Sequence, residues 1–393
     1  MKNGVAAAEG KLELPDIPAG KNAELEVTTG HTVDANSEYF FRVRYDLTEA
    51  TAWHPAGMPV AWDEIPLPWG KRQVVEKKAS TTAASFTEND SSITIKADQV
   101  IAVIDRSKGV ITSLRHKEQE WLLTPMHLNF WRPSTNNDEG AKLNFQLGIW
   151  QYAGVRATAE KVTVVQQGND VIVTAELKIP AKESTATVSY HFSGAGQIEI
   201  NTQFRPASGL PELPKVGFQC EIPSRTPVCK WYGRGPHENY TDRKTGAWTT
   251  IHELMVPMMF HRYSDPQESG NRTDVRWLLL TSPMGGSGLR IDATGNYLLE
   301  TSIYPCPARD LTFAMHASEL QFGDHYTLNV DHRQAGLGGT NSWGELALPQ
   351  YRIQAGQPYD WSFMLDFSET PVPPKRAQPP MLPRNLPAKP PEK

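Results

Sequence analysis

The feature that most constrains this chain is an alternation of apolar and polar residues at period two, repeated along most of its length. Such alternation is typical of antiparallel strands that bury one face and expose the other. No stretch of about twelve residues carries the apolar stripe of an amphipathic helix. The sequence therefore predicts an all-β fold. Alternating segments occur at residues 12–14, 24–27, 39–45, 92–96, 161–165 and 171–177.

Short polar or glycine-containing segments between alternating runs predict three β-hairpins, because such residues favour tight turns. Residues 167–170 would join 161–165 to 171–177. Residues 193–196 would join 185–192 to 197–204, and residues 355–358 would join 351–354 to 359–365.

Changes in composition divide the chain into four parts. Residues 1–70 hold only about four alternating segments, whereas a complete immunoglobulin-like sandwich needs about seven strands. We therefore expect a partial sandwich here, and the chain to be the C-terminal part of something larger. Residues 71–90 are polar and predict a linker, while residues 91–367 are long enough for one large two-sheet domain. Residues 368–393 contain nine prolines and predict a disordered tail, because proline cannot donate to a strand ladder.

Charge and hydropathy exclude several classes of protein. The chain has 39 Lys and Arg against 44 Asp and Glu, a net charge of −5, which argues against a nucleic-acid partner. No apolar run approaches the ~18 residues that a transmembrane helix needs, so no membrane partner is expected. Residues 1–16 lack the apolar core of a signal peptide, which favours a cytoplasmic location.

The usual motifs of metal, nucleotide and nucleophile sites are missing from the sequence. Three cysteines without a CxxC pair rule out a disulfide scaffold and a cysteine-rich zinc site. Cys220 and Cys229 lie in strand-like surroundings and are expected to be buried thiols. His252 and Glu253 begin like a zinc-protease helix, but the second histidine of that motif is absent. Neither a phosphate-binding glycine loop nor a GxSxG motif occurs.

Four segments of unusual composition remain after these exclusions. They read TPMHLNFWRPSTNNDEG at 124–140, WYGRGPHENYTDR at 231–243, DPQESGNRTDVRW at 265–277 and GLGGTNSWG at 336–344. Together, and in this order, they resemble the C-terminal domain of the large β-galactosidases of glycoside hydrolase family 2. Residues 1–70 resemble the second half of the immunoglobulin-like domain that precedes it. The resemblance implies a partial immunoglobulin-like sandwich followed by a large galactose-mutarotase-like β-supersandwich.

The resemblance also implies that this chain and a partner contribute different parts of one active site. Retaining glycosidases need two carboxylates about 5 Å apart, and in this family both are glutamates on the strands of a (β/α)8 barrel. No barrel pattern occurs here, so the chain is expected to carry no catalytic residue and to be inactive alone. It would complete the active site of a β-galactosidase barrel portion or large subunit that hydrolyses terminal β-D-galactose. The family's magnesium and sodium (Mg²⁺, Na⁺) are expected in that missing part, none in this chain, and the complete enzyme is expected to be an oligomer.

Trp343 is the residue that the resemblance assigns to the substrate. In the family, the tryptophan of the matching GG-x-x-SW motif reaches the mouth of the barrel and forms a platform for the sugar. An indole face can contact a pyranose ring without demanding one hydroxyl pattern. The alternative is a core tryptophan that follows a turn.

Residues 130–140 would form a loop beside the same active site. The resemblance points to Asn137, Asp138 and Gly140, with Asp138 and Gly140 setting the hinge of a mobile loop. The alternative is a buried turn in which Asn137 and Asp138 cap the local backbone.

The second and third segments are expected to be architectural. Their glycines allow turns, and two or three buried or half-buried pairs between arginines and carboxylates should hold the long loops together. The residues concerned are Gly235, Glu238, Asn239, Tyr240, Glu268, Arg272, Asp274 and Arg276.

Two other functions stay open at this point. One is a non-catalytic, carbohydrate-binding or structural β-sandwich. The other is an aldose-epimerase-like enzyme, which needs a histidine and a glutamate facing one sugar ring. His237 and Glu238 are adjacent in sequence and would point to opposite faces of a strand, which counts against the epimerase.

Overall fold

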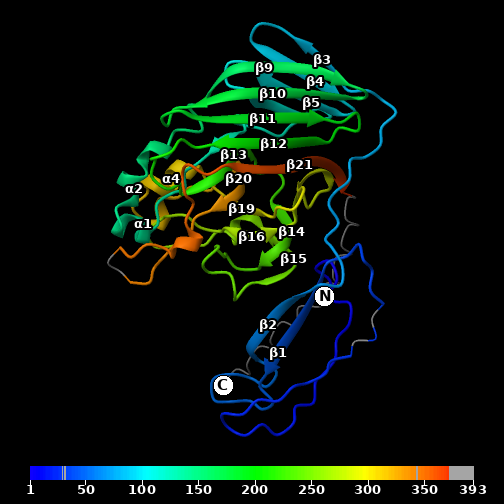
Figure 1. The fold of residues 1–393 in the computed structure, drawn as a ribbon, viewed down its shortest axis with the longest axis vertical. Coiled ribbons are helices and arrows are strands. Elements are labelled where there is room, and N and C mark those ends of the chain that lie inside the picture. The colour runs from blue at the N-terminus through cyan, green and yellow to red at the C-terminus, as the bar shows by residue number, and fades with distance from the viewer. Residues whose placement is uncertain (29, 31, 342–343, 371–393) are drawn as a thin grey trace, which may run out of the picture.

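The computed structural model describes residues 1–370 apart from residues 29, 31, 342 and 343. This part of the chain is almost entirely β-structure, which confirms the predicted all-β fold (Figure 1). Its strands form four antiparallel sheets, and each helix is about one turn long. None of these helices is long and apolar enough to traverse a membrane.

The largest sheet has nine strands in the order β15-β14-β17-β18-β21-β12-β11-β10-β9. The last strand in sequence, β21, is therefore the middle strand in space, paired with β12 on one side and β18 on the other. The strands are β9 (Thr158–Gln167), β10 (Asp170–Ile179), β11 (Ser184–Phe192), β12 (Ile198–Arg205), β14 (Val228–Gly235), β15 (Trp248–Met255), β17 (Trp277–Thr281), β18 (Gly286–Ala293) and β21 (Tyr359–Thr370).

A five-stranded sheet packs against the middle of the large one, in the order β16-β19-β20-β13-β8. Phe218 on its strand β13 lies 6.1 Å from Trp361 and 5.5 Å from Phe363 of β21, measured between ring centroids. These buried rings join the two sheets into a sandwich. The strands are β8 (His127–Asn129), β13 (Lys215–Pro223), β16 (Arg272–Val275), β19 (Leu299–Tyr304) and β20 (His325–Gln334).

A second five-stranded sheet covers the other end of the large sheet, where β9–β11 lie (Figure 1). The buried Tyr190 hydroxyl of β11 donates to the backbone oxygen of Gly109, which lies in the turn between β5 and β6, at 2.9 Å. The strands are β3 (Ser85–Glu88), β4 (Ser92–Ala97), β5 (Val100–Asp105), β6 (Val110–His116) and β7 (Gln119–Glu120). Strand β3 falls inside the segment predicted as a linker.

Short helices fill the connections between strands, and they are too short to produce a periodic stripe in the sequence. They are α1 (Asn136–Gly140), α2 (Leu143–Gln146), η1 (Gly148–Trp150), α3 (Val256–Met259), α4 (Ala308–Phe313), η2 (Ala317–Glu319) and η3 (Pro349–Tyr351).

Two of the three predicted hairpins are confirmed, namely β9–β10 and β11–β12. The third, 351–354 with 359–365, is wrong. Strand β21 pairs with β12 through residues 359–365 and with β18 through residues 363–370, and residues 351–354 form no strand against it. Ile353 instead forms an isolated bridge with Leu213. Strand β21 also runs to Thr370, three residues into the segment predicted as a tail; the rest of that segment, 371–393, lies outside the described residues.

The described residues of the segment 1–70, which leave out 29 and 31, contain two strands rather than about four. Strands β1 (Tyr39–Asp46) and β2 (Pro59–Leu67) pair with each other at the opposite end of the molecule from β3 and β9 (Figure 1). The strands predicted at 12–14 and 24–27 are wrong, since both segments are exposed and carry no ladder. An alternating run forms a strand only where a partner edge supplies its hydrogen bonds.

Candidate functional site

The loop at 130–140 is built around an ion pair between Arg132 and Asp138. The guanidinium donates to both carboxylate oxygens, Nε to Oδ2 at 3.1 Å and Nη2 to Oδ1 at 2.9 Å. Both side chains are buried. Asp138 also closes a capping box at the start of α1: its carboxylate accepts from the Thr135 N–H, and its own N–H donates to the Thr135 hydroxyl. Asp138 thus has the capping role that the sequence analysis left open.

Arg132 also holds the start of the fourth sequence segment. Its Nη1 donates to the backbone oxygen of Ala335 at 2.6 Å, and Nη2 donates to that of Gly336 at 3.3 Å. One buried guanidinium therefore joins α1 to the chain that leaves β20. A bidentate arginine fixes both distance and orientation, which a lysine cannot do.

Two further contacts fix the glycine-rich loop that follows. Asn137 uses its Nδ2 to donate to the backbone oxygen of Leu337 at 3.1 Å. The Gly338 N–H donates to the Asp242 carboxylate at 2.9 Å. Asn137 therefore braces the loop rather than its own turn, and three segments far apart in sequence meet here.

Two glycines of this loop have backbone conformations that favour glycine. Gly339 and Gly344 both have φ near +91°, a conformation that a residue with a Cβ rarely adopts. A Cβ would lie 2.8 Å from the Asn137 Nδ2 at position 339, and 2.7 Å from the Gly140 oxygen at position 344. Gly140 thus packs against Gly344 of this loop. Trp343, the residue predicted to bind sugar, lies outside the described residues.

A cavity of about 40 Å³ lies between these segments, lined among others by Asn137, Asp138, Gly336 and Leu337. This space suits a few water molecules and is too small for a sugar ring. A sugar at this place would have to lie on the outside of the loop.

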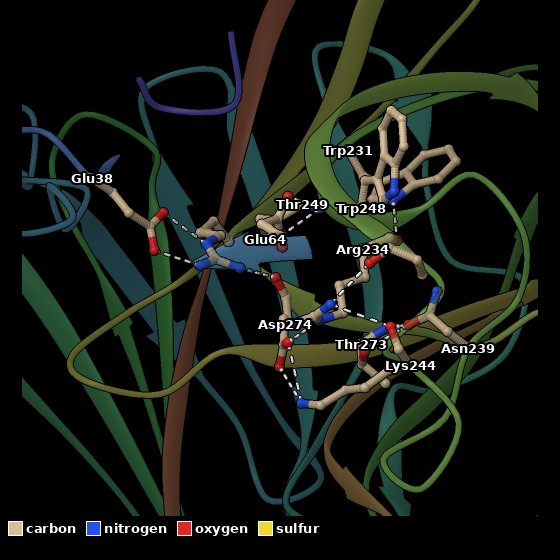
Figure 2. A network of polar contacts seen from close by, with 12 residues as sticks. Glu38, Glu64, Trp231, Arg234, Asn239, Lys244, Trp248, Thr249, Thr273 and Asp274 are labelled. Carbon is tan, nitrogen blue, oxygen red and sulfur yellow. Dashed lines mark hydrogen bonds and ion pairs between the residues drawn. The ribbon is translucent and has the colours of Figure 1, made fainter. Parts of the chain in front are cut away.

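The predicted ion pairs form, although some of their partners differ from those expected. Arg243 donates to Glu238 at 2.7 Å, and the Gly270 N–H donates to the other oxygen of the same carboxylate at 2.8 Å. Asp274 accepts from Arg234 at 2.6 Å and from Lys244 at 3.0 Å (Figure 2). These pairs join the end of β14 and the loop that follows it to β16 and the segment before it.

Arg276 pairs with a residue of the N-terminal region, Glu38, at 3.0 Å through Nε (Figure 2). The Tyr232 hydroxyl donates to the same carboxylate at 2.6 Å. Beside this contact, Arg42 pairs with Glu64 at 2.7 Å, and the Glu64 carboxylate also accepts from the backbone of β15. Polar contacts thus attach residues 38–64 to the large sheet.

Glu268 and Arg272 were expected to take part in ion pairs, but among the described residues neither forms one, which corrects the prediction for both. Glu268 is buried and accepts from the hydroxyls of Tyr240, at 3.5 Å, and Tyr304. Arg272 donates to three backbone oxygens, and its guanidinium lies 5.3 Å from the centre of the Trp231 ring. Burial raises the pKa of Glu268 and lowers the pKa of Arg272 to about 10. Both side chains are buried and have an interior role rather than a place in an exposed site.

Asn239 and Gly235 are also interior braces. The Asn239 Oδ1 accepts from the N–H and the hydroxyl of Thr273 at 2.9 and 2.6 Å. A Cβ on Gly235 would lie 2.8 Å from the Trp231 ring, so a larger residue has no room. Their neighbour Asp242 contacts the loop after β20 by accepting from the Gly338 N–H.

Sequence reasoning missed two kinds of residue. Arg132 and Asp242 lie inside the quoted segments, so their position in those segments was the available signal. The buried pair of Lys215 and Asp331, 2.8 Å apart, gave no signal because each residue lies alone in a strand. Burial raises the pKa of Asp331 to about 7, although Lys215 acts in the opposite direction.

The predicted buried thiols are confirmed. Cys220, Cys229 and Cys306 are free and buried, and burial raises the pKa of each thiol to about 12. Among the described residues, no group of three His, Cys, Asp or Glu side chains is placed to hold a metal ion.

Fold and site together define an all-β sandwich domain of three sheets, one more than the two predicted for residues 91–367, whose distant loops are clamped by Arg132. Comparison with known families identifies it further. Residues 96–365 match the model described as "Beta galactosidase small chain", and residues 1–68 match "Beta-galactosidase, domain 4". The chain belongs to the β-galactosidase small-chain family.

Curated relatives are similar to this chain over most of its length. The β-galactosidase of Priestia megaterium is 33% identical over 84% of this chain and 31% of its own. The β-galactosidase of Lactobacillus delbrueckii subsp. bulgaricus is 29% identical over 88% and 34%. This chain thus spans about a third of the length of these relatives. Among solved structures, the galactose 1-epimerase of Lactobacillus acidophilus aligns at a TM-score of 0.45 with 8% identity, over 74% of this chain and 99% of that one.

Proposed function

We propose that this chain is the C-terminal component of a β-galactosidase and completes the active site of a catalytic barrel carried elsewhere. The observation that carries the proposal is the small-chain match over residues 96–365, since the matched relatives are named β-galactosidases. The proposed reaction is hydrolysis of terminal β-D-galactose. Its two carboxylates, and any magnesium or sodium, are assigned to the barrel portion, and the assembled enzyme is proposed to be an oligomer.

In this proposal the chain supplies a sugar platform. The clamp of Arg132 and Asp138, with Asn137 and Asp242, would hold the loop on which Trp343 stands. Such a platform offers apolar contact and no proton-transfer group.

The test is reconstitution of turnover. The full chain alone should not hydrolyse nitrophenyl galactoside. Mixing it with the N-terminal two thirds of a relative, such as the Priestia megaterium enzyme, should restore hydrolysis. Turnover by the highly purified chain alone would contradict the proposal. Failure of every barrel partner would favour the non-catalytic carbohydrate-binding sandwich.

The platform has its own test in the reconstituted enzyme. Trp343→Ala should raise KM for lactose by about tenfold with a smaller change in kcat, because stacking on an aromatic contributes roughly 1–3 kcal/mol. Trp343→Phe should recover part of the loss. Trp53→Ala, which removes an exposed indole of the N-terminal region, is the matched control and should leave KM unchanged. An unchanged KM in Trp343→Ala with a large fall in Tm would mean that Trp343 only packs.

A further inference from the structure

A second hollow lies on the far side of residues 352–354 from the clamped loop. It has a volume of about 360 Å³ and opens between the end of β20 and the start of β21. Tyr297, from the β18–β19 connection, also lines it. The volume is within the range of small-molecule pockets. Neither Asn137, Asp138 nor Gly140 contributes to it.

The wall of this hollow is aromatic. The His332 ring stacks on Trp361, with centroids 5.5 Å apart and planes 12° apart. Tyr297 and Tyr359 meet the same imidazole edge-on, at 5.3 and 6.3 Å. Burial lowers the pKa of His332 to about 4, so the imidazole is neutral at neutral pH. The wall therefore presents uncharged rings.

The rim is polar and largely held in place. Arg352 and Gln354 both donate to Glu212 at 2.7 Å, which fixes the loop before β21. Asp360 is paired with Arg205. Arg333 is different: it lines the hollow, and within the described chain its guanidinium makes no hydrogen bond or ion pair. It therefore offers free donors over the aromatic wall.

Uncharged rings beside amide, carboxylate and guanidinium groups are the combination that suits a polyhydroxylated ring. A strongly anionic ligand fits less well, because Asp360 stands on the same rim and Arg352 is already paired. We infer that this hollow binds a pyranose sugar, with Tyr297 and His332 against the ring and Arg333 on its hydroxyls. This site is separate from the proposed platform at Trp343 and does not require the barrel.

The experiment uses the full chain without any barrel partner. Galactose, lactose and inorganic phosphate are titrated separately, with binding followed by calorimetry and ligand-observed NMR. The sugars should saturate with a dissociation constant on the order of millimolar. Arg333→Ala and Tyr297→Ala should each weaken binding about tenfold or more, and Arg333→Lys should weaken it less. Arg333 and Tyr297 are both exposed, so these variants should keep the parent Tm.

Two controls separate this inference from the proposed function. Arg309→Ala removes an exposed arginine elsewhere and should leave sugar binding unchanged, as should Trp343→Ala. Absence of saturable sugar binding would overturn the inference, and so would binding that depends on Trp343 but not on Arg333. Binding of phosphate alone would make the hollow an anion site. These binding results do not depend on whether a barrel partner restores turnover, so the inference and the proposed function can fail independently.

Discussion

The two ends of this molecule use the same alternating pattern and reach different results. In the sandwich, β13 and β21 bury Phe218 and Phe363 between two sheets. In the N-terminal region, β1 and β2 form a two-stranded ladder, and Val60 and Ile65 of β2 stay 54% and 50% exposed. Alternation therefore selects the strand conformation, whereas burial depends on a second sheet to pack against.

The two regions also differ in what stabilises them. Apolar area removed from water dominates in the sandwich. The N-terminal region is attached by the Glu38–Arg276 and Arg42–Glu64 pairs, with Arg42 over the Trp248 ring at 4.3 Å. Such contacts are weaker and more local than a core. A substitution in one region should therefore destabilise that region and have little effect on the stability of the other.

The largest effect is expected in the sandwich. Phe218→Ala would leave a cavity between β13 and β21 and should lower the free energy of unfolding by about 3–5 kcal/mol. Ile65→Ala in β2 is the matched change and should cost less than about 1 kcal/mol, because Ile65 is half exposed. Urea unfolding of both variants measures the difference. Equal losses would show that the N-terminal region has a core of its own.

An intermediate effect is expected from acid. The pKa of His332 is lowered by burial from 6.5 to about 4, so the unfolded chain binds this proton at a higher pH than the folded chain. The corresponding stability is present above pH 6.5 and is lost as the pH falls toward 4, by about 3 kcal/mol. His332→Phe can still stack on Trp361 but cannot be charged.

The variant provides the measurement. Between pH 6.5 and 4, the unfolding free energy of His332→Phe should rise relative to the parent by up to that amount. A constant difference across this range would mean that His332 is solvated. Protease cleavage within residues 6–36 should not follow the same pH dependence, since those residues do not pack on His332.

The smallest effect is expected where the two regions meet. Glu38→Gln removes the charge that Arg276 pairs with and should cost about 1–2 kcal/mol of local attachment. Cleavage within residues 1–70 should accelerate while the Tm of the sandwich changes by less than a degree or so. Glu49→Gln, an exposed change in the same region, is the control. A fall of several degrees in Tm would show that the regions unfold as one unit.

Local features of this fold could be predicted from sequence, and long-range pairing could not. The β9–β10 and β11–β12 hairpins follow from turn residues between adjacent runs. The wrongly predicted hairpin at 351–365 had the same local signals, but β21 pairs instead with β12 and β18, which lie far from it in sequence. A short window of sequence does not indicate such long-range pairing.

The candidate site also combines features that can be predicted locally with features that depend on long-range contacts. Asn137, Asp138 and Gly140 could be proposed as site residues because their segment is unusual and resembles a known family. The role of Arg132 could not be predicted, because its partners at 335 and 336 lie about 200 residues away. Glu268 and Arg272 were expected to take part in ion pairs and do not, because buried hydroxyls and backbone oxygens are their nearest partners.

The central place of β21 has a consequence for synthesis of the protein. Strand β12 ends at Arg205 and β18 at Ala293, but the strand that joins them begins only at Tyr359. During translation, the edges of β12 and β18 that pair with β21 therefore lack a partner until β21 has been synthesised. A nascent chain stalled before that point would expose the edges most prone to aggregation. Slow codons or a chaperone acting between residues 293 and 359 would govern the yield of folded protein.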